Sequence, residues 1–305
     1  MKEFDDYEYS TMICDLIHDM EYIEKSNRGK VATIRQYAEV VVRKILNIGS
    51  DTQLTLGQVG YKKSFLDKIE LLEEKLGRKL LDCIEKIRPT GNDGTHTQYT
   101  ESFTDTQVAE LEDALLDLYS ILFLKFFTSV KIDLCFNPHV LSLFSLLPPV
   151  VREKTWQYLY ELDNNNIIVA DKLCLSIIKT HGKDSAFAWL EENRTQLESI
   201  PYPTEAEKHS YLIAHRDLHD PSQSIFTLNF DGHDNIYDLL KCKTEDKSTS
   251  INESGKLYSN FEEAISHYQK QINLYYLYDL FNGNEELTEI NALVQFAYIG
   301  RIPTL

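Results

Sequence analysis

The residues best suited to chemistry lie in one short segment, residues 87–96, with the sequence IRPTGNDGTH. Arg88 offers a planar fork of donors to phosphoryl oxygens and can stabilise negative charge that develops on them. His96 can accept and return a proton near neutral pH. Together they would suffice, without a metal ion or a cofactor, for a ribose 2′-hydroxyl to attack its own phosphate. The sequence therefore indicates Arg88 and His96 as candidate catalytic residues for the cleavage of RNA.

The same segment also has a purely structural interpretation. A proline inside a helix usually ends it, and the two glycines with Asn92 and Asp93 are typical of turns. We therefore expect the preceding helix to stop at Pro89 and residues 90–96 to form an interhelical turn outside any regular element. On local physics alone, this turn with a surface His96 is the favoured interpretation.

Helices are expected to position this segment. The sequence predicts helices over about 4–25, over 31–47, and over 61–87 with an interruption near Gly77. Thr104 and Gln107 form a capping box, which predicts a long and largely buried helix behind them. The first 130 residues thus form four helices around a polar loop.

Three sequence pieces resemble a known family. The helix containing IRQYAE at 34–39, the second helix ending EKIR at 85–88, and GNDGTH at 91–96 are similar to the HEPN superfamily of helical bundles. The resemblance covers roughly residues 10–130 and is closest to an uncharacterised bacterial branch found also in restriction-enzyme subunits and phage-defence proteins. It implies an all-helical fold, frequent homodimers and, in active members, metal-independent RNA cleavage by an arginine and a histidine, which fall on Arg88 and His96.

The family pattern leaves two functions open. Seven residues separate Arg88 from His96, whereas the classical nuclease motif has four to six, and members of this branch are often viewed as interaction or regulatory modules. The alternative to a ribonuclease is therefore a non-catalytic module of an anti-phage or restriction system that binds a protein partner.

Candidate binding residues surround the catalytic pair. Arg35, Glu39 and Arg43 lie one turn apart on one helix face, where a surface ladder of two ion pairs is favoured; the resemblance implies instead that Arg35 and Glu39 orient the segment bearing His96. The other candidates for binding RNA are Asn92, Lys62, Lys63, Arg78 and Lys79.

The charge distribution bears on the choice of partner. The formal net charge of −17 should repel a polyanion at long range. Residues 25–88, however, contain 14 Lys and Arg against 8 Asp and Glu, so one basic segment lies inside an acidic protein. RNA is therefore a possible partner for the first half of the chain.

The second half is expected to be a separate helical domain. Pro148 and Pro149 mark a boundary, which gives domains 1–147 and 148–305. We expect helices at about 150–162, 167–181, 184–197 and 205–215, and a helix opened by a capping box of Ser259 and Glu262. Alternation over 224–230 predicts a short strand that could pair with 236–240, and 243–255 reads as an exposed loop.

Two features of this half concern partners. His209, His215 and His219 have a spacing that can bind zinc, but no further ligand pattern accompanies them, so a polar helix end is favoured and no metal site is predicted. The C-terminal third is acidic and rich in tyrosine, which suits a surface for a protein partner.

Composition sets the remaining limits. The acidic N-terminus argues against an export leader and indicates a cytoplasmic protein. The longest apolar run, 121–127, is too short to span a membrane and contains Lys125. We therefore expect a mainly α protein, with a HEPN-like N-terminal bundle followed by a helical region with a small β element. Its expected role is in bacterial defence or stress response, acting on RNA as a homodimer, and an acidic mimic of nucleic acid is a third possibility.

Overall fold

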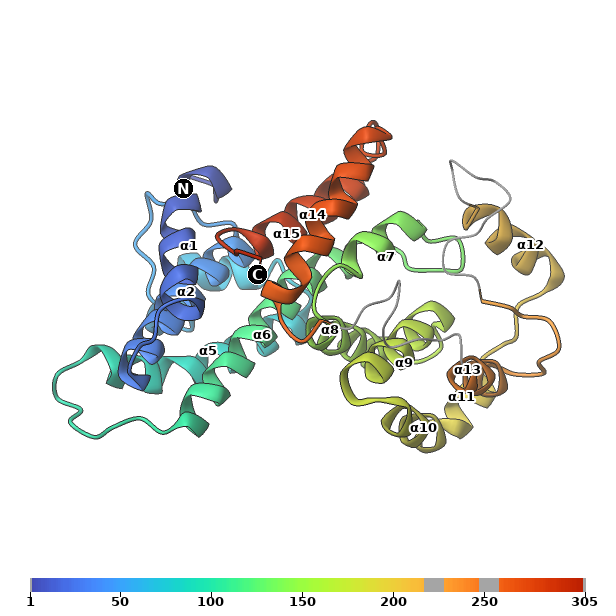
Figure 1. Ribbon diagram of the computed structural model, residues 1–305, viewed down its shortest axis with the longest axis horizontal. Coiled ribbons are helices and arrows are strands. Elements are labelled where there is room, and N and C mark those ends of the chain that lie inside the picture. Colours follow the sequence, from blue (N-terminus) through green and yellow to red (C-terminus); the bar gives the residue numbers. More distant parts are fainter. Residues whose placement is uncertain (1, 217–227, 247–257, 304–305) are drawn as a thin grey trace. The chain divides into compact units, whose positions relative to one another are not determined.

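The computed structural model describes residues 2–216, 228–246 and 258–303 (Figure 1). Every regular element in these ranges is an α-helix, which confirms the mainly α class. None of the described helices is both long and apolar enough to cross a membrane. The chain divides into two compact units, which we call unit 1 (1–128 with 295–305) and unit 2 (129–294). The predicted boundary residues, Pro148 and Pro149, lie inside unit 2 at the start of a helix.

Unit 1 is built around three long helices. α2, α5 and α6 pack against one another, and α1 packs on α2. Two short helices, α3 and α4, fill the connection between α2 and α5. The helices of unit 1 are α1 (Asp6–Glu21), α2 (Asn27–Leu46), α3 (Leu56–Val59), α4 (Lys63–Ile69), α5 (Glu74–Thr95) and α6 (Asp105–Phe127).

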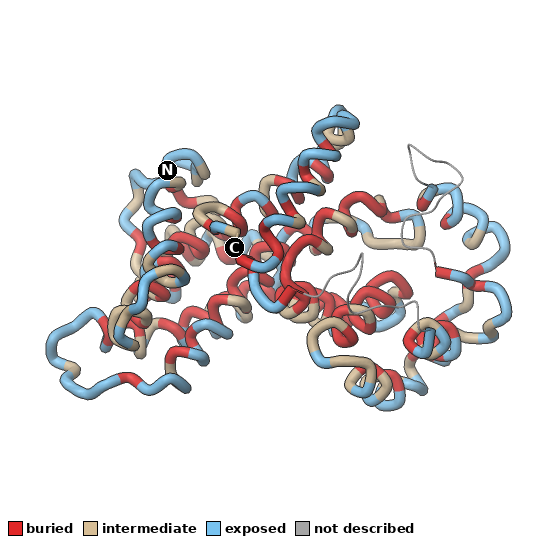
Figure 2. The backbone as a smooth tube through the Cα atoms, in the orientation of Figure 1, coloured by how far each residue is buried: buried red, intermediate tan, exposed pale blue. Residues whose placement is uncertain are grey.

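The ends of α2 and α6 follow local capping rules. The Ser26 side chain accepts a hydrogen bond from the Gly29 N–H at the start of α2, and Asn47 ends it in the left-handed conformation. The predicted capping box of Thr104 and Gln107 is confirmed at the start of α6. Both helices bury long apolar stripes, which Figure 2 shows as red stretches of tube.

The predicted C-terminal end of α5 was wrong. The helix does not stop at Pro89 but continues to Thr95, so the expected turn is helical. Tertiary packing decides this. A Cβ added at Gly91 would lie 2.7 Å from Arg35 Cδ, and one at Gly94 would lie 2.5 Å from Val31 Cγ1. The two glycines thus let α5 approach α2 closely as a helix, and this contact outweighs the cost of a proline inside it. The predicted break also moves, from Gly77 to residues 70–73.

Residues 295–303, which follow unit 2 in sequence, complete the core of unit 1. The Arg301 guanidinium donates to the Tyr119 hydroxyl at 3.0 Å and to the Ala297 carbonyl at 2.9 Å. The Tyr119 and Tyr37 hydroxyls are 2.5 Å apart, and both rings are buried. Residues far apart in sequence therefore share one buried polar network.

Unit 2 contains the remaining helices. α8 and α9 form its most extensively packed pair, and α10 and α13 pack on α9. The predicted helices at 150–162 and 167–181 are confirmed, whereas 184–197 is two helices that meet at Asn193. The helices are α7 (Pro138–Phe144), α8 (Pro149–Leu162), α9 (Ile167–His181), α10 (Lys183–Glu192), α11 (Arg194–Ser199), α12 (Glu205–Ala214), α13 (Ile236–Glu245), α14 (Phe261–Leu277) and α15 (Glu285–Tyr298), the last of which extends into unit 1.

The predicted β element is not seen in the described residues. Residues 236–240 belong to α13, because the Asn235 side chain accepts the Asp238 N–H and starts a helix there. Of the other expected strand, 224–227 lie outside the described residues and 228–230 form no regular element. The capping box at Ser259 is also wrong by one residue, since Asn260 caps α14.

Candidate functional site

The continuous α5 helix arranges the predicted site residues in a line. Arg88, Asn92 and His96 follow one another at intervals of four residues, so each lies about one turn beyond the last on nearly the same face. We call these three residues the α5 stripe. His96 is the C-terminal cap, and its N–H donates to the Asn92 carbonyl at 2.9 Å. Eight residues of helix place Arg88 and His96 roughly 12 Å apart along the axis. Within one chain the two residues are therefore separated by more than two turns of α5.

Arg88 forms an ion pair with a neighbouring carboxylate on α5. Its guanidinium donates to Glu85 Oε2 at 2.7 Å, and 37% of the side chain is exposed. The hydrogen bond to Glu85, with the charge of that carboxylate, raises the pKa of Arg88. The Nε atom is buried and has no hydrogen-bond partner among the described residues. Arg88 thus presents a permanent positive charge at the surface beside one carboxylate.

Arg35 and Glu39 connect α2 to its neighbours α5 and α3. The Arg35 stem covers Gly91, and its guanidinium pairs with Glu39 at 3.4 Å. Glu39 also accepts the Leu56 N–H at 3.3 Å, which connects α2 to α3. Burial raises the pKa of Glu39, although the charge of Arg35 opposes the shift. Arg35 thus packs against the turn of α5 that separates Arg88 from Asn92, and Glu39 links Arg35 to α3.

The remaining candidate cations are spread out. Arg43 donates to the Gly49 and Thr52 carbonyls at 3.0 Å each, so it ties down a loop. The Lys62 ammonium lies 4.7 Å from the centre of the Phe65 ring, and the neighbouring Lys63 is exposed. The last two candidates are on the first turns of α5, where Arg78 pairs with Glu74 and is followed by Lys79.

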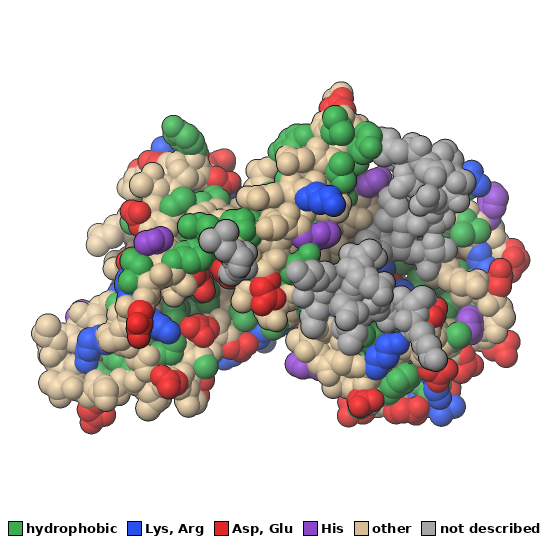
Figure 3. Space-filling model, viewed as in Figure 1, with side chains coloured by type: hydrophobic (Ala, Val, Ile, Leu, Met, Phe, Trp, Pro, Cys, Tyr) green, Lys and Arg blue, Asp and Glu red, His purple; other side chains and the backbone are tan. Residues whose placement is uncertain are grey.

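Many cations of the basic segment are engaged inside unit 1. Lys25 pairs with Asp19, Lys44 with Asp6, and Lys86 with Asp117. Arg28 donates to three carbonyls, those of Asp93, Tyr99 and Glu101. On the face that Figure 3 shows, blue Lys and Arg side chains are interspersed with red Asp and Glu side chains. Most of the Lys and Arg side chains that give residues 25–88 their positive excess therefore make contacts within unit 1.

The histidines and tyrosines of unit 2 have distinct environments. His215 is buried, its Nδ1 lies 3.0 Å from the Tyr211 carbonyl, and burial lowers its pKa. His209 is exposed, and His219 lies outside the described residues. Most of the C-terminal aromatic residues build the core, but the end of α14 exposes a patch of apolar and aromatic side chains, formed by Leu274, Tyr276, Leu277 and Tyr278.

A group of cations in unit 2 was not among the predicted site residues. Arg152 on α8 and Lys172 and Lys179 on α9 line one cavity. A signal was present, because Lys172, Ser176 and Lys179 recur at helical spacing within the largely apolar α9.

Comparison with known proteins adds no family to these observations. No protein-family model, curated protein or solved structure matches the chain. The chemistry available to unit 1 therefore follows from its own residues, an exposed histidine, a half-buried amide and an arginine along one helix.

Proposed function

We propose that unit 1 is a HEPN-like bundle that acts on RNA as a homodimer in bacterial defence or stress response, with the α5 stripe as its reactive surface. The observation that supports this most is the alignment of Arg88, Asn92 and His96 along α5. A helix presents such a stripe with fixed spacing, which a mobile turn would not do. The resemblance of the same residues to the HEPN motif points to the same surface.

The 12 Å separation along α5 determines how the site must be assembled. Two α5 helices related by a two-fold axis run antiparallel when their axes lie perpendicular to it, so Arg88 of one protomer faces His96 of its partner. Each dimer would then hold two composite sites, with Asn92 at the centre of each stripe. This arrangement meets the requirement that base and cation reach the same phosphate.

The reaction proposed at each composite site is transesterification. His96 removes the proton of the ribose 2′-hydroxyl while that oxygen attacks the adjacent phosphorus, and the bond from phosphorus to the 5′ oxygen breaks. The proton passes to the leaving 5′ oxygen, which gives a 2′,3′-cyclic phosphate and a 5′-hydroxyl. Arg88 stabilises the charge on the non-bridging oxygens, and it must exchange Glu85 for phosphate to do so.

Cleavage of single-stranded RNA in the presence of a chelator tests this function. His96→Ala should lower the rate by about 10²- to 10⁴-fold, as expected for loss of a general acid or base. His18→Ala is the matched control, because His18 is an exposed histidine of unit 1 that lies on α1. Cleavage that persists in His96→Ala, or that requires a divalent metal ion, would rule the mechanism out.

A second function, a non-catalytic module that binds a protein partner, is favoured by two observations. The cations of unit 1 are largely paired with its own carboxylates and carbonyls, and the end of α14 exposes Leu274, Tyr276, Leu277 and Tyr278. If the protein neither cleaves nor binds RNA at low salt, this function is the better one. Leu277→Asp should then disrupt the complex with the partner, whereas His96→Ala should leave it intact.

A further inference from the structure

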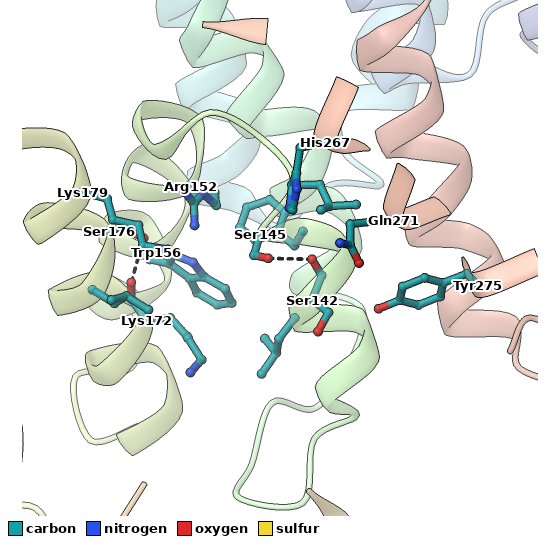
Figure 4. A pocket seen from close by; sticks show the side chains of 14 residues that line it. Ser142, Ser145, Arg152, Trp156, Lys172, Ser176, Lys179, His267, Gln271 and Tyr275 are labelled. Atoms are coloured by element: carbon teal, nitrogen blue, oxygen red, sulfur yellow. Dashed lines mark hydrogen bonds between the residues drawn. The ribbon is translucent and has the colours of Figure 1, made fainter. Parts of the chain in front are cut away.

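Unit 2 contains a cavity of about 350 Å³ among α7, α8, α9 and α14. Figure 4 shows the cationic side chains of α8 and α9 on one side of it and side chains of α14 on the other, with Ser142 and Ser145 between them. The volume is at the small end of the range for ligand sites, which suits a metabolite and excludes a folded macromolecule. Polar groups reach it from both sides: Arg152, Lys172, Lys179, His267, Gln271 and Tyr275.

The cavity is positively charged. Arg152, Lys172 and Lys179 line it, and none of the described lining residues is acidic. Arg152 and Lys172 are only 5% and 7% exposed. Three cations around a small enclosed space are unusual in a chain with a net charge of −17, since burial of like charges is unfavourable without a counter-charge.

The cations differ in how they are compensated. The Lys172 ammonium pairs with Asp171 at 2.6 Å, and Asp171 also pairs with Lys243 of α13. Lys179, in contrast, makes no hydrogen bond or ion pair within the part of the chain that the structure describes. Burial and the nearby charges of Arg152 and Lys172 lower the pKa of Lys179 to about 8. The cavity therefore holds a destabilised positive charge that an anion would stabilise.

The serine hydroxyls do not compensate this charge. Ser145 Oγ donates to the Ser142 carbonyl at 2.7 Å, and Ser176 Oγ donates to the Lys172 carbonyl at 2.7 Å, as the dashed lines in Figure 4 show. Their protons are already used by the backbone. The charged donors available to a ligand are therefore Arg152, Lys172 and Lys179.

We propose that this cavity binds a small ligand through a phosphate group, held by Arg152, Lys172 and Lys179. A phosphate carries up to two negative charges and three terminal oxygens, so it can engage a guanidinium fork and two ammonium groups at once. A carboxylate has one charge and two oxygens and would leave part of the cationic cluster uncompensated. The site is independent of the α5 stripe, because all the residues that form it belong to unit 2.

Calorimetric titration of the full chain with inorganic phosphate and with adenosine monophosphate tests the proposal. Both probes carry the group that the cavity should recognise, and acetate serves as the anion that should not bind. Tighter binding of the nucleotide would indicate a phosphate monoester as the ligand, and equal or weaker binding would indicate free phosphate. Absence of binding by both probes would overturn the proposal.

Variants locate the binding in the cavity. Lys179→Met should weaken phosphate binding at least tenfold, and its partial exposure makes it less disruptive than a change at Arg152 or Lys172. The matched control is Lys270→Met, because Lys270 is exposed on α14 and does not line the cavity. Unchanged affinity in Lys179→Met, with native circular dichroism, would contradict the site. Equal weakening in both variants would show a non-specific charge effect and would contradict it too.

Discussion

Asp171 shows how one buried carboxylate organises unit 2. Its side chain is 1% exposed, and it pairs with Lys172 beside it on α9 and with Lys243 of α13. Burial alone would raise the pKa of Asp171, but the two ammonium groups outweigh burial and lower it to about 2. The carboxylate is therefore charged at all physiological pH values and joins α13 to α9.

Removing this charge should destabilise the protein. Asp171→Asn leaves the buried Lys172 without its counter-charge, so we expect a loss of about 3–5 kcal/mol in the free energy of unfolding. Urea denaturation of full-length protein measures it. Asp184→Asn, an exposed position on α10, is the control and should change the free energy by less than about 0.5 kcal/mol.

The destabilisation caused by Asp171→Asn should depend on pH. A depressed pKa stabilises the folded state above the unfolded value of about 4, and the stabilisation is lost as the pH falls towards the folded value of about 2. The difference in the free energy of unfolding between wild type and Asp171→Asn should accordingly be constant from about pH 5 to 7, where the carboxyl is ionised in both the folded and the unfolded state. It should shrink between about pH 4 and 2, and a gap that stays constant there would contradict the assigned pairing.

At the scale of elements, α5 marks the limit of local sequence rules. α2 and α6 could be predicted because their caps and apolar spacing act within the helix itself. The end of α5 could not, since Pro89, Gly91 and Gly94 are local signals for a turn whereas contact with α2 decides the outcome. The chemical types of the candidate site residues could be predicted from the sequence, but their alignment along α5 could not. Residue identity is local, but the stripe exists only when the segment is helical.

The helix contact yields a prediction at Gly94. Alanine there normally favours a helix by about 1 kcal/mol over glycine. Because its Cβ would lie 2.5 Å from Val31 Cγ1, we expect Gly94→Ala instead to destabilise the protein by about 1–3 kcal/mol in urea denaturation.

Gly60→Ala provides the comparison. The nearest atom to an added Cβ at Gly60, Leu81 Cδ2, is 3.9 Å away, so this substitution should be tolerated. If Gly94→Ala stabilised the protein as much as helix propensity predicts, α5 could not approach α2 through Gly94.

At the scale of the whole molecule, the composite site predicts complementation between two inactive variants. Arg88→Ala and His96→Ala should each lower the rate of RNA cleavage to a small fraction of the wild-type rate. When equal amounts are unfolded and refolded together, half of the dimers contain one of each protomer, and one of their two sites has both wild-type groups. The mixture should recover about a quarter of the wild-type rate.

The control for this experiment is a mixture that cannot restore a site. His96→Ala refolded with His96→Gln should stay inactive, because neither protomer supplies the imidazole. Light scattering of the wild type should show a dimer. A strict monomer that still cleaves RNA would contradict the composite site, since one chain holds the two groups roughly 12 Å apart along α5.

The return of residues 295–303 to unit 1 has a consequence for the order in which the core of that unit is made. Tyr37 and Tyr119 are translated before unit 2, but Arg301, which donates to the Tyr119 hydroxyl, is translated after it. All of unit 2 is translated in between. The nascent protein can therefore fold its second unit while the first still has an incomplete core, and a chaperone that binds exposed apolar helix faces could bind unit 1 until Arg301 has been made.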